Sequence, residues 1–305
     1  MSPSPARQTQ SYLRGLFAKR GLSPRHRLGQ NFLIDLNIHD LIVELAEVGP
    51  DDVILEVGPG AGALTSLMGS RGARVLAVEL DPGMAQLAGE ATAEMPNVRI
   101  LNLDALAGKH RIDPRALEAL REARDGGDRP FKLVANLPYN VATPLIMNLL
   151  VDDDFRPSLL VVTIQKELGE RMMAPSGSPT RGALSVLVQA LADIEIARVL
   201  PPSVFWPRPK VDSAVVVIRP DPAKRAAIGD LNWLHRLVRD VFIHRRKNLR
   251  RVLTDLGRDL WPKDEIPPLL QSLEIDGTLR AEALEIQQWI ALAQALRERW
   301  GDTRE

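Results

Sequence analysis

Short apolar runs alternate with longer stretches of helical spacing over the first two thirds of the chain. The runs are rich in valine, isoleucine and leucine, which is typical of buried strands. The predicted strands are Val53–Val57, Arg74–Glu79, Val98–Asn102, Phe131–Ala135 and Leu159–Ile164, and the predicted helices include Leu36–Val48, Gly62–Ser70 and Pro82–Glu94. Strands that alternate with helices predict a parallel sheet with crossover helices, which is an α/β fold.

The pattern changes near Pro220. Before it, Val215–Ile218 predicts one more strand, paired with a strand at Ile194–Leu200. After it, Leu231–Leu256 and Arg280–Arg299 have helical spacing without strands. We therefore predict a flexible basic tail over residues 1–24, an α/β domain over residues 25–220 and a helical domain over residues 221–305.

The composition is that of an ordinary globular protein. Of 305 residues, 45% are hydrophobic and 26% are charged. No apolar run approaches the ~18 residues that span a bilayer, and the N-terminus lacks an apolar signal core, so a cytoplasmic protein is expected. Cysteine is absent and the five histidines show no ligand spacing, so no metal site is expected. The absence of an apolar coiled-coil stripe favours a monomer.

Positive charge is concentrated in two segments, although the net charge is zero. Met1–Ile34 has six basic residues and no acidic one, and His235–Arg251 has seven basic residues against a single acid, Asp240. Clustered cations are typical of a surface that meets a polyanion such as nucleic acid. Each segment alone also fits a solvated helix face, so the charge pattern needs support from other motifs.

Three glycines follow the first predicted strand, in the segment ILEVGPGAGALT. Gly58, Gly60 and Gly62 fall at a strand-to-helix turn, where a bound cofactor needs close backbone approach and a helix N-terminus. Together with Ala63, they also satisfy the G-x-G-x-x-[GA] dinucleotide pattern. A nicotinamide cofactor and a purely structural turn therefore both stay as alternatives for this motif.

Acidic residues follow the next two predicted strands. Glu79 comes 17 residues after Gly62, at a strand end, where a carboxylate can accept hydrogen bonds from both hydroxyls of a ribose. Asp104 follows the third strand, where a carboxylate can accept from an adenine amino group. Because the carboxyl ends of parallel strands share one edge of a sheet, these residues are expected to face one ligand.

The fourth predicted strand ends in the segment NLPY. Pro138 lacks an N–H group and restrains Leu137 to an extended conformation, so that a main-chain carbonyl can point outward. The side-chain oxygen of Asn136 and the carbonyl of Leu137 or Pro138 then form a pair of acceptors for an NH₂ group. Tyr139 offers a ring on which a planar base can stack, at ~1–3 kcal/mol per base. This order of residues indicates a site that holds and orients an aromatic amine.

Seven segments together resemble the ribosomal RNA adenine N6,N6-dimethyltransferases, the KsgA (RsmA) enzymes of the small subunit. They are RHRLGQNFL, EVGPGAGALT, VELD, LDAL, NLPYNVATPL, IQKELGERMMA and PPSVFWPRPKVDSAV. The resemblance extends from residue 25 to the segment TLRAEAL at residues 278–284. It implies a Rossmann-like S-adenosylmethionine-dependent methyltransferase domain, followed by a small C-terminal all-helical domain that binds RNA.

The resemblance also implies roles for individual residues. The expected cofactor-binding residues are Asn31, Leu33, Gly58, Gly60, Gly62, Glu79, Asp104 and Asn136. The expected catalytic residues are Asn136, Leu137, Pro138 and Tyr139, with Phe205 or Trp206 as a second wall against the target base. The expected RNA-binding residues are Arg208, Lys210, Arg245, Arg246, Lys247, Arg250 and Arg251. One departure is visible, because Arg181 stands where the family usually has tyrosine, which would alter an RNA contact or the packing of a loop.

The implied reaction is dimethylation of the N6 amines of two adjacent adenosines near the 3′ end of 16S rRNA, in a pre-30S particle. Three alternatives stay open. A large-subunit rRNA adenine methyltransferase of the macrolide-resistance type shares the catalytic logic. A non-catalytic ribosome assembly factor would be expected to lose the motifs that are intact here. An NAD-dependent dehydrogenase would leave Asn136–Tyr139 without a role.

Overall fold

The computed structural model describes residues 8–108, 111–126, 129–257 and 262–300. The chain folds into two compact units, each built from two stretches of sequence. The first contains residues 1–169 and 195–220, and the second contains residues 170–194 and 221–305. The predicted division near Pro220 coincides with one of these boundaries, whereas residues 170–194, expected in the α/β domain, belong to the second unit.

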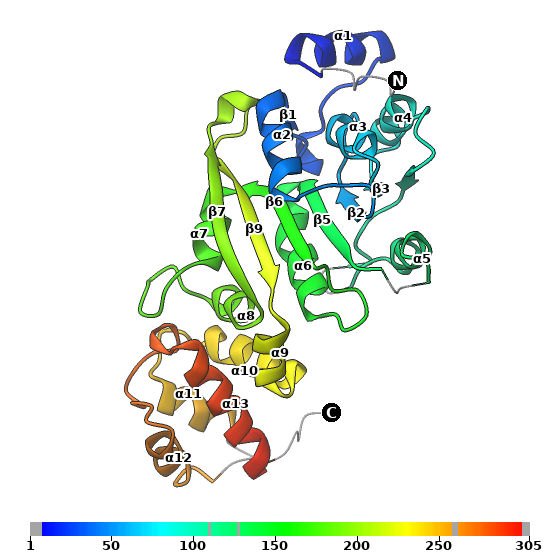
Figure 1. Cartoon of the computed structure of the whole chain (residues 1–305). Coiled ribbons are helices and arrows are strands. Elements are labelled where there is room, and N and C mark those ends of the chain that lie inside the picture. Colours follow the sequence, from blue (N-terminus) through cyan, green and yellow to red (C-terminus); the bar gives the residue numbers. More distant parts are fainter. Residues whose placement is uncertain (1–7, 109–110, 127–128, 258–261, 301–305) are drawn as a thin grey trace. The chain divides into compact units, whose positions relative to one another are not determined.

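The first unit contains a seven-stranded sheet in the order β4-β3-β2-β5-β6-β9-β7 (Figure 1). Its strands are β2 (Val53–Val57), β3 (Arg74–Glu79), β4 (Val98–Asn102), β5 (Phe131–Asn136), β6 (Leu159–Gln165), β7 (Ala192–Leu200) and β9 (Ser213–Pro220). Strands β2 to β6 pair in parallel, and β9 pairs antiparallel with β6. The α/β fold and the predicted strands are confirmed, and the ends of β2, β3 and β5 come together at one edge.

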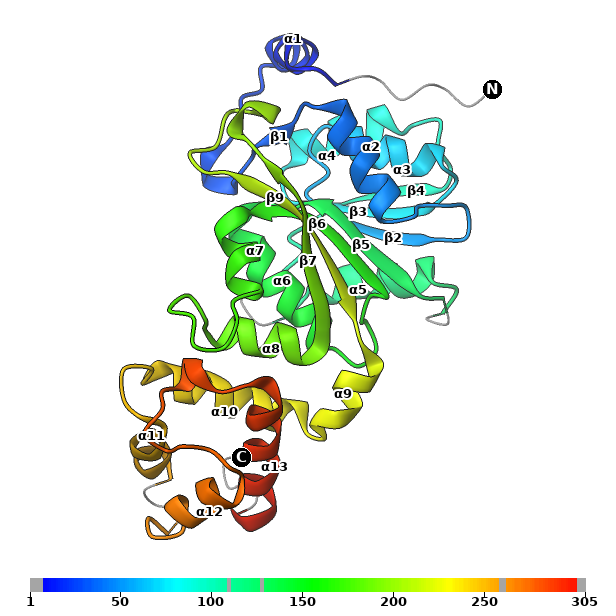
Figure 2. The ribbon, with the colours of Figure 1, turned by 60° about the vertical axis from the view of Figure 1, so that its left-hand side comes forward.

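Helices cover both faces of this sheet (Figure 2). Helices α2 (Leu36–Leu45) and α3 (Ala63–Ser70) lie on one face, where their apolar residues join strand residues in one core cluster. Helices α5 (Pro114–Ala123) and α6 (Tyr139–Val151) lie on the other face. Every second residue of a strand points toward α2 and α3, and the residues between them point toward the other face. Both sets are mostly apolar because helices cover both faces of the sheet. Helix α4 (Pro82–Ala91) connects β3 to β4, and helix α7 (Lys166–Met172) follows β6.

The segment predicted as a flexible tail contains helix α1 (Gln10–Arg20). Thr9 caps its first turn through its side chain, and Gly21 ends it in the left-handed conformation, with φ 61°. Leu13 and Phe17, one turn apart, are buried against the rest of the unit. For residues 8–24 the prediction of a flexible tail was wrong, whereas residues 1–7 lie outside the described part of the chain. Leu13, Leu16 and Phe17 have helical spacing, but the contacts that bury them are with distant segments.

A short antiparallel ribbon joins β1 (Phe32–Leu33) to β8 (Phe205–Trp206). The ribbon brings the GQNFL segment beside the VFWPRPK segment, although more than 170 residues separate them in the chain. The short 3₁₀ helices η1 (His26–Leu28) and η2 (Pro202–Val204) precede the two strands.

The second unit is helical. It contains α8 (Ala183–Leu191), α9 (Pro222–Ile228), α10 (Leu231–Ile243), α11 (Leu249–Leu256), α12 (Ile266–Ser272), η3 (Ala281–Ala283) and α13 (Ile286–Trp300). Its core centres on Trp289, which is fully buried and stacks on Phe242 at 5.8 Å between ring centroids. Trp233 donates its indole N–H to Ala293 O at 2.7 Å. Helix α8 contacts α9, α10 and α13, which explains why residues 170–194 belong to this unit. Within the described parts of the chain, no helix is long and apolar enough to cross a membrane.

Candidate active site

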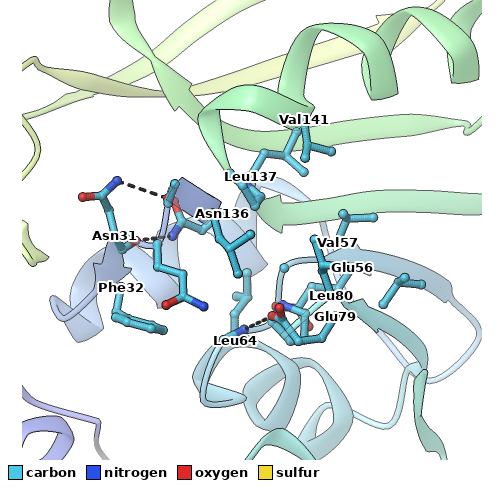
Figure 3. A pocket seen from close by; sticks show the side chains of 18 of the residues that line it. Asn31, Phe32, Glu56, Val57, Leu64, Glu79, Leu80, Asn136, Leu137 and Val141 are labelled. Carbon is cyan, nitrogen blue, oxygen red and sulfur yellow. Dashed lines mark hydrogen bonds between the residues drawn. The ribbon is translucent and has the colours of Figure 1, made fainter. Parts of the chain in front are cut away.

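The ends of β2, β3 and β5, the segment after β4 and the segment before β1 line one pocket (Figure 3). Nearly all the residues predicted to bind the cofactor or catalyse the reaction lie in this lining. They are Asn31, Leu33, Gly58, Gly60, Glu79, Asp104, Asn136, Leu137, Pro138 and Tyr139. Gly62 is the exception, because it caps helix α3 and packs toward Ala88 of α4. The sequence motifs therefore converge on one place, as open α/β sheets predict.

The glycine-rich turn after β2 is packed too closely for side chains. A Cβ atom on Gly58 would lie 2.9 Å from Cδ of Pro138, and one on Gly60 would lie 2.9 Å from the ring of Phe32. Both glycines also have positive φ, 78° and 57°, which other residues adopt only with strain. The turn is thus fixed between the NLPY segment and the GQNFL segment, and its backbone forms one wall of the pocket.

Glu79 is held by main-chain N–H groups at the end of β3. Its Oε2 accepts from Gly60 N at 3.2 Å, and its Oε1 accepts from Asp81 N at 2.9 Å. Burial raises the pKa of this carboxyl, and the hydrogen bonds from Asp81 and Gly60 partly oppose the rise. Because each carboxylate oxygen has a further lone pair, Glu79 can still accept hydrogen bonds from a ligand in the pocket.

Glu56 also lines the pocket, and the sequence analysis did not identify it. Its side chain is buried within β2, and Thr65 Oγ1 donates to its Oε2 at 2.6 Å. Burial raises the pKa of Glu56 to about 8, although the hydrogen bond from Thr65 opposes the rise. The signal was present, since a carboxylate inside an otherwise apolar strand needs a reason, and Glu56 lies two residues before Gly58 of the glycine turn.

Asn136 is oriented by the segment before β1. Its Nδ2 donates to Asn31 O at 3.0 Å, and Asn31 Nδ2 donates to Gly29 O at 3.2 Å. Since Nδ2 is occupied, the Oδ1 atom of Asn136 is left as the acceptor that the pocket side can use. Asp104 is exposed at the pocket rim, where its Oδ1 accepts from Leu106 N at 2.9 Å.

The rest of the NLPY segment is also fixed. Leu137 N donates to Thr163 O at 3.1 Å, whereas Pro138 O accepts from Val141 N at 2.9 Å and starts helix α6. The hydroxyl of Tyr139 lies 2.8 Å from Ser213 Oγ, and burial raises the pKa of that hydroxyl. The ring of Tyr139 is therefore pinned at the edge of the pocket.

The structure gives the predicted second aromatic wall a packing environment outside the pocket lining. Neither Phe205 nor Trp206 is among the residues that line the pocket. Phe205 is buried in the core under α2, and Trp206 packs edge to face on Phe17 of α1, with 5.4 Å between ring centroids. Helix α1, which was expected to be mobile, supplies the packing partner of Trp206, whereas Phe205 packs in the sheet core.

Other lining residues were also missed, among them Leu80, His39 and Gln8. Leu80, just after Glu79, is exposed for a large apolar residue, at 47%. His39 on α2 is buried, and burial lowers its pKa to about 4, so the ring is neutral near pH 7. Gln8, just before α1, is 4% exposed. Only Leu80 could have been inferred from its place in a motif, since His39 and Gln8 reach the pocket through packing.

The predicted RNA-binding residues fall in both units. Arg208 and Lys210 are exposed in the first unit, in the loop that leads to Ser213 and so to the hydroxyl of Tyr139. In the second unit, Arg246, Lys247, Arg250 and Arg251 are exposed where α10 turns into α11. Asp255 pairs with two members of this group, at 3.0 Å from Lys247 and 3.3 Å from Arg251. Arg245 differs, because it is half-buried and donates to Pro179 O at 2.8 Å.

Arg181 is buried inside the second unit, with a relative exposure of 1%. It donates to Ala174 O at 2.6 Å, to Gln189 Oε1 at 3.0 Å and to Leu284 O at 3.4 Å. Burial lowers the pKa of this guanidinium group, and the charge of Glu285 opposes that shift. Of the two roles expected for Arg181, loop packing is therefore the one that the geometry supports.

The described residues contain no group of three or more histidine, aspartate or glutamate side chains that could hold a metal ion. The pocket chemistry consists instead of carboxylates, amides, main-chain groups and one tyrosine.

Comparison with known proteins agrees with the geometry. The family model described as ribosomal RNA adenine dimethylase matches residues 21–298. A protein named ribosomal RNA small subunit methyltransferase A, from Ligilactobacillus salivarius, is 38% identical, over 93% of this chain and 93% of its own length. A protein of the same name from Geobacter metallireducens is 39% identical, over 90% and 96%.

Two solved structures share the fold. A dimethyladenosine transferase from Plasmodium falciparum has a TM-score of 0.71 and 22% identity, covering 87% of this chain and 96% of its own. The 23S rRNA methyltransferase ErmE has a TM-score of 0.61 and 26% identity, covering 87% and 99%. Given the matched family model and the near-complete coverage of the relatives, this chain belongs to the ribosomal RNA adenine dimethylase family.

Proposed function

We propose that this protein transfers methyl groups from S-adenosylmethionine to the N6 amines of two adjacent adenosines near the 3′ end of 16S rRNA, two groups to each. The observation that carries the proposal is the arrangement of Asn136, Leu137 and Tyr139 at the pocket edge, where Asn136 donates to Asn31 O of the GQNFL segment. The expected substrate is a pre-30S particle in the cytoplasm, and the protein is expected to act as a monomer.

The chemistry of the pocket fits the proposed cofactor. Glu79 supplies carboxylate acceptors for ribose hydroxyls. In Asp104, Oδ1 accepts from Leu106 N, so Oδ2 is the acceptor that suits an adenine amino group. The close-packed backbone at Gly58 and Gly60 leaves main-chain groups, not side chains, to face the methionine end. Asn31 and Leu33, which also line the pocket, would complete the set of cofactor-binding residues.

S-Adenosylmethionine supplies an electrophilic methyl group when bound, so this chain's task is to place and activate the adenine amine. The N6 lone pair is delocalised into the ring and is a poor nucleophile. Two acceptors, Asn136 Oδ1 and a main-chain carbonyl, favour the tetrahedral amine in which positive charge develops. Leu137 O suits the second role better than Pro138 O, because Pro138 O already accepts hydrogen bonds from Val141 and Ala142 in α6. Asn136 accepts without adding charge near Glu79, and the proton leaves to water after transfer.

Tyr139 would stack on the target base. Its ring is held through the hydrogen bond to Ser213, which fixes the stacking plane before the base arrives. An adenine can reach this edge only after it leaves its own stack, so the RNA site must be a loop or a distorted helix. Arg208 and Lys210, in the loop before Ser213, would then contact the neighbouring phosphates.

A large-subunit substrate is the main enzymatic alternative. The relatives named as small-subunit enzymes reach 39% identity, whereas the ErmE structure is 26% identical. The test supplies labelled S-adenosylmethionine with unmodified small subunits, free 16S rRNA or 23S rRNA, and identifies the modified nucleosides by mass spectrometry. We expect N6,N6-dimethyladenosine from small subunits and strongly reduced formation of it by an Asn136→Ala variant.

The other outcomes are equally informative. Dimethyladenosine from 23S rRNA would assign the protein to the large-subunit alternative. Binding of S-adenosylmethionine without transfer to any RNA would contradict the catalytic proposal and leave an assembly factor. Failure to bind S-adenosylmethionine would contradict the proposed cofactor itself.

A further inference from the structure

Gln8 reaches the glycine-rich turn from a distant part of the chain. It lies just before helix α1, lines the active-site pocket and is almost fully buried. Its Nε2 group donates to the main-chain carbonyl of Ala61 at 2.7 Å, across 53 residues. Ala61 lies in the turn between Gly60 and Gly62, so this hydrogen bond ties the N-terminal segment to the wall of the pocket.

Helix α1 is packed in a way that fixes Gln8. Phe17 contacts the ring of Phe32 edge to face, with 5.4 Å between centroids. Phe32 is itself a pocket residue and lies against Gly60. Leu13 joins the same apolar cluster together with Met84 of α4. The helix, the GQNFL segment and the glycine turn therefore share one packed cluster.

Polar contacts hold α1 along its length. Arg14 lies over the ring of Trp206, at 6.0 Å from its centroid, and Arg20 pairs with Glu90 at 2.6 Å. Both ends of the helix are capped, at Thr9 and at Gly21. Such exposed ion pairs add little stability, but together with the aromatic packing they define one position for the helix. Two arginines of the basic N-terminal segment are thus engaged within the first unit.

We propose that Gln8 is a positioning residue for the amino-acid end of S-adenosylmethionine, delivered to the pocket by helix α1. Its amide N–H holds the glycine turn through Ala61, and its Oε1 is left as an acceptor on the pocket side. An amide oxygen cannot donate, so it suits the ammonium group of the cofactor and not its carboxylate. Glu56 lines the same pocket, and its carboxyl accepts a hydrogen bond from Thr65. The inference rests on the proposed function, because it assumes that this cofactor binds beside the turn.

The test compares Gln8→Met and Gln8→Ala with a control, Ser11→Ala, on the full-length protein. Gln8→Met keeps the length of the side chain but neither donates nor accepts, and Ser11 is exposed on the same helix. We expect the Kd for S-adenosylmethionine to rise about tenfold or more in both Gln8 variants, as for the loss of one hydrogen bond to a charged group. The KM for RNA should be unchanged, and Ser11→Ala should bind the cofactor as the wild type does.

A merely structural role would give a different result. In that case the melting temperature of the Gln8 variants would fall while the Kd measured well below it matched the wild type, and the proposal would be overturned. A wild type that fails to bind S-adenosylmethionine would overturn the proposed function as well. A wild type that binds it, beside Gln8 variants that bind it equally well, would overturn only the role of Gln8.

A second comparison tests the delivery by α1. Phe17→Leu loosens the aromatic packing of the helix without changing a residue of the pocket lining. We expect Phe17→Leu to raise the Kd for S-adenosylmethionine. In the Phe17→Leu, Gln8→Met double variant, the fold-increase in Kd should be smaller than the product of the two single fold-increases. Independent, fully multiplicative effects would show that Gln8 reaches the pocket without help from α1.

Discussion

The Nδ2 group of Asn136 donates to the main-chain carbonyl of Asn31 at 3.0 Å, and the two residues are 105 positions apart. This bond settles the orientation of the Asn136 amide, because an asparagine whose Nδ2 is engaged presents Oδ1 elsewhere. It also links the two motifs that the proposed reaction needs, one on each side of the pocket. A substitution at Asn136 therefore tests the acceptor and the link at once.

Asn136→Ala and Asn136→Asp should both lower the kcat of methyl transfer by about 10²–10³-fold, the usual loss when one preorganised polar group is removed from a transition state. Alanine lacks the acceptor, and aspartate cannot donate to Asn31 O and brings a second charge near Glu79. The rate of dimethyladenosine formation, followed by mass spectrometry, measures the effect. Asn37→Ala, at an exposed position of α2, is the control. Near-normal kcat in Asn136→Ala would show that the amine is held by other groups.

The glycine turn makes a prediction about cofactor binding. Gly58→Ala places a Cβ atom 2.9 Å from Pro138 and requires alanine at φ 78°, so it should displace the NLPY segment and weaken S-adenosylmethionine binding by about tenfold or more. Gly89→Ala in α4 is the matched control, because its Cβ would meet nothing within 4 Å. That variant should bind normally and gain up to about 1 kcal/mol of stability. Isothermal titration and chemical denaturation give both quantities, and normal binding by Gly58→Ala would contradict the packing argument.

Much of the first unit could be predicted from the sequence because the relevant signals are local. Strands such as Val53–Val57 are largely apolar, and the side chains expected to bind the cofactor follow the strand ends. Gly58, Glu79 and Asn136 could be assigned to one pocket because parallel strands put their carboxyl ends at one edge. No contact between distant segments had to be known for that step.

The features that were missed depend on contacts between distant segments. Helix α1 is stabilised by Phe17 against Phe32 and Trp206, and none of these pairs is visible as a period in the sequence. The sequence left Arg181 between an RNA contact and loop packing, because arginine is rarely buried and its three acceptors are not visible as a sequence pattern. Residues 170–194 join the helical unit for a similar reason, since the apolar face of α8 is completed by helices that follow Pro220 in the chain.

Glu56 predicts how stability changes with pH. Its pKa in the folded protein is about 8, above the ordinary value of 4.5, so its contribution to stability is fully present below about pH 4.5 and is lost as the pH rises through 8. Between pH 4.5 and 8, the free energy of unfolding of the wild type should fall by up to about 1.4 kcal/mol per pH unit relative to that of Glu56→Gln, because the glutamine side chain is neutral throughout. Chemical denaturation of both proteins from about pH 5 to pH 9 measures the difference. Glu94→Gln, at an exposed position, should show the same pH dependence of stability as the wild type. If Glu56→Gln also showed that pH dependence, the raised pKa of Glu56 would be contradicted.

Arg181 predicts a change in stability without a change in RNA binding. Arg181→Met keeps the aliphatic stem but removes the donor to Leu284 O and Gln189 Oε1, while Ala174 O keeps only its hydrogen bond from Gln189 Nε2. The free energy of unfolding should therefore fall by about 1–3 kcal/mol. Arg181→Tyr keeps one donor and should lose less. The denaturation midpoint measures this, and RNA affinity at 25 °C should match the wild type because the side chain is buried. Weaker RNA binding at unchanged stability would instead place Arg181 at the RNA surface.

The exposed turn between α10 and α11 should contribute to RNA affinity through charge. Arg246→Ala should weaken RNA binding about fivefold at low salt and reduce the slope of log K against log salt by about 0.7–0.9, as expected for one lost phosphate contact. Arg251→Ala should have a smaller effect, because Asp255, at 3.3 Å, already offsets part of its charge. Arg99→Ala, an exposed arginine paired with Glu122 in the first unit, is the control. An unchanged salt slope in Arg246→Ala would mean that the basic residues of this turn form a solvated surface, and Arg208 and Lys210 would then be the next residues to test.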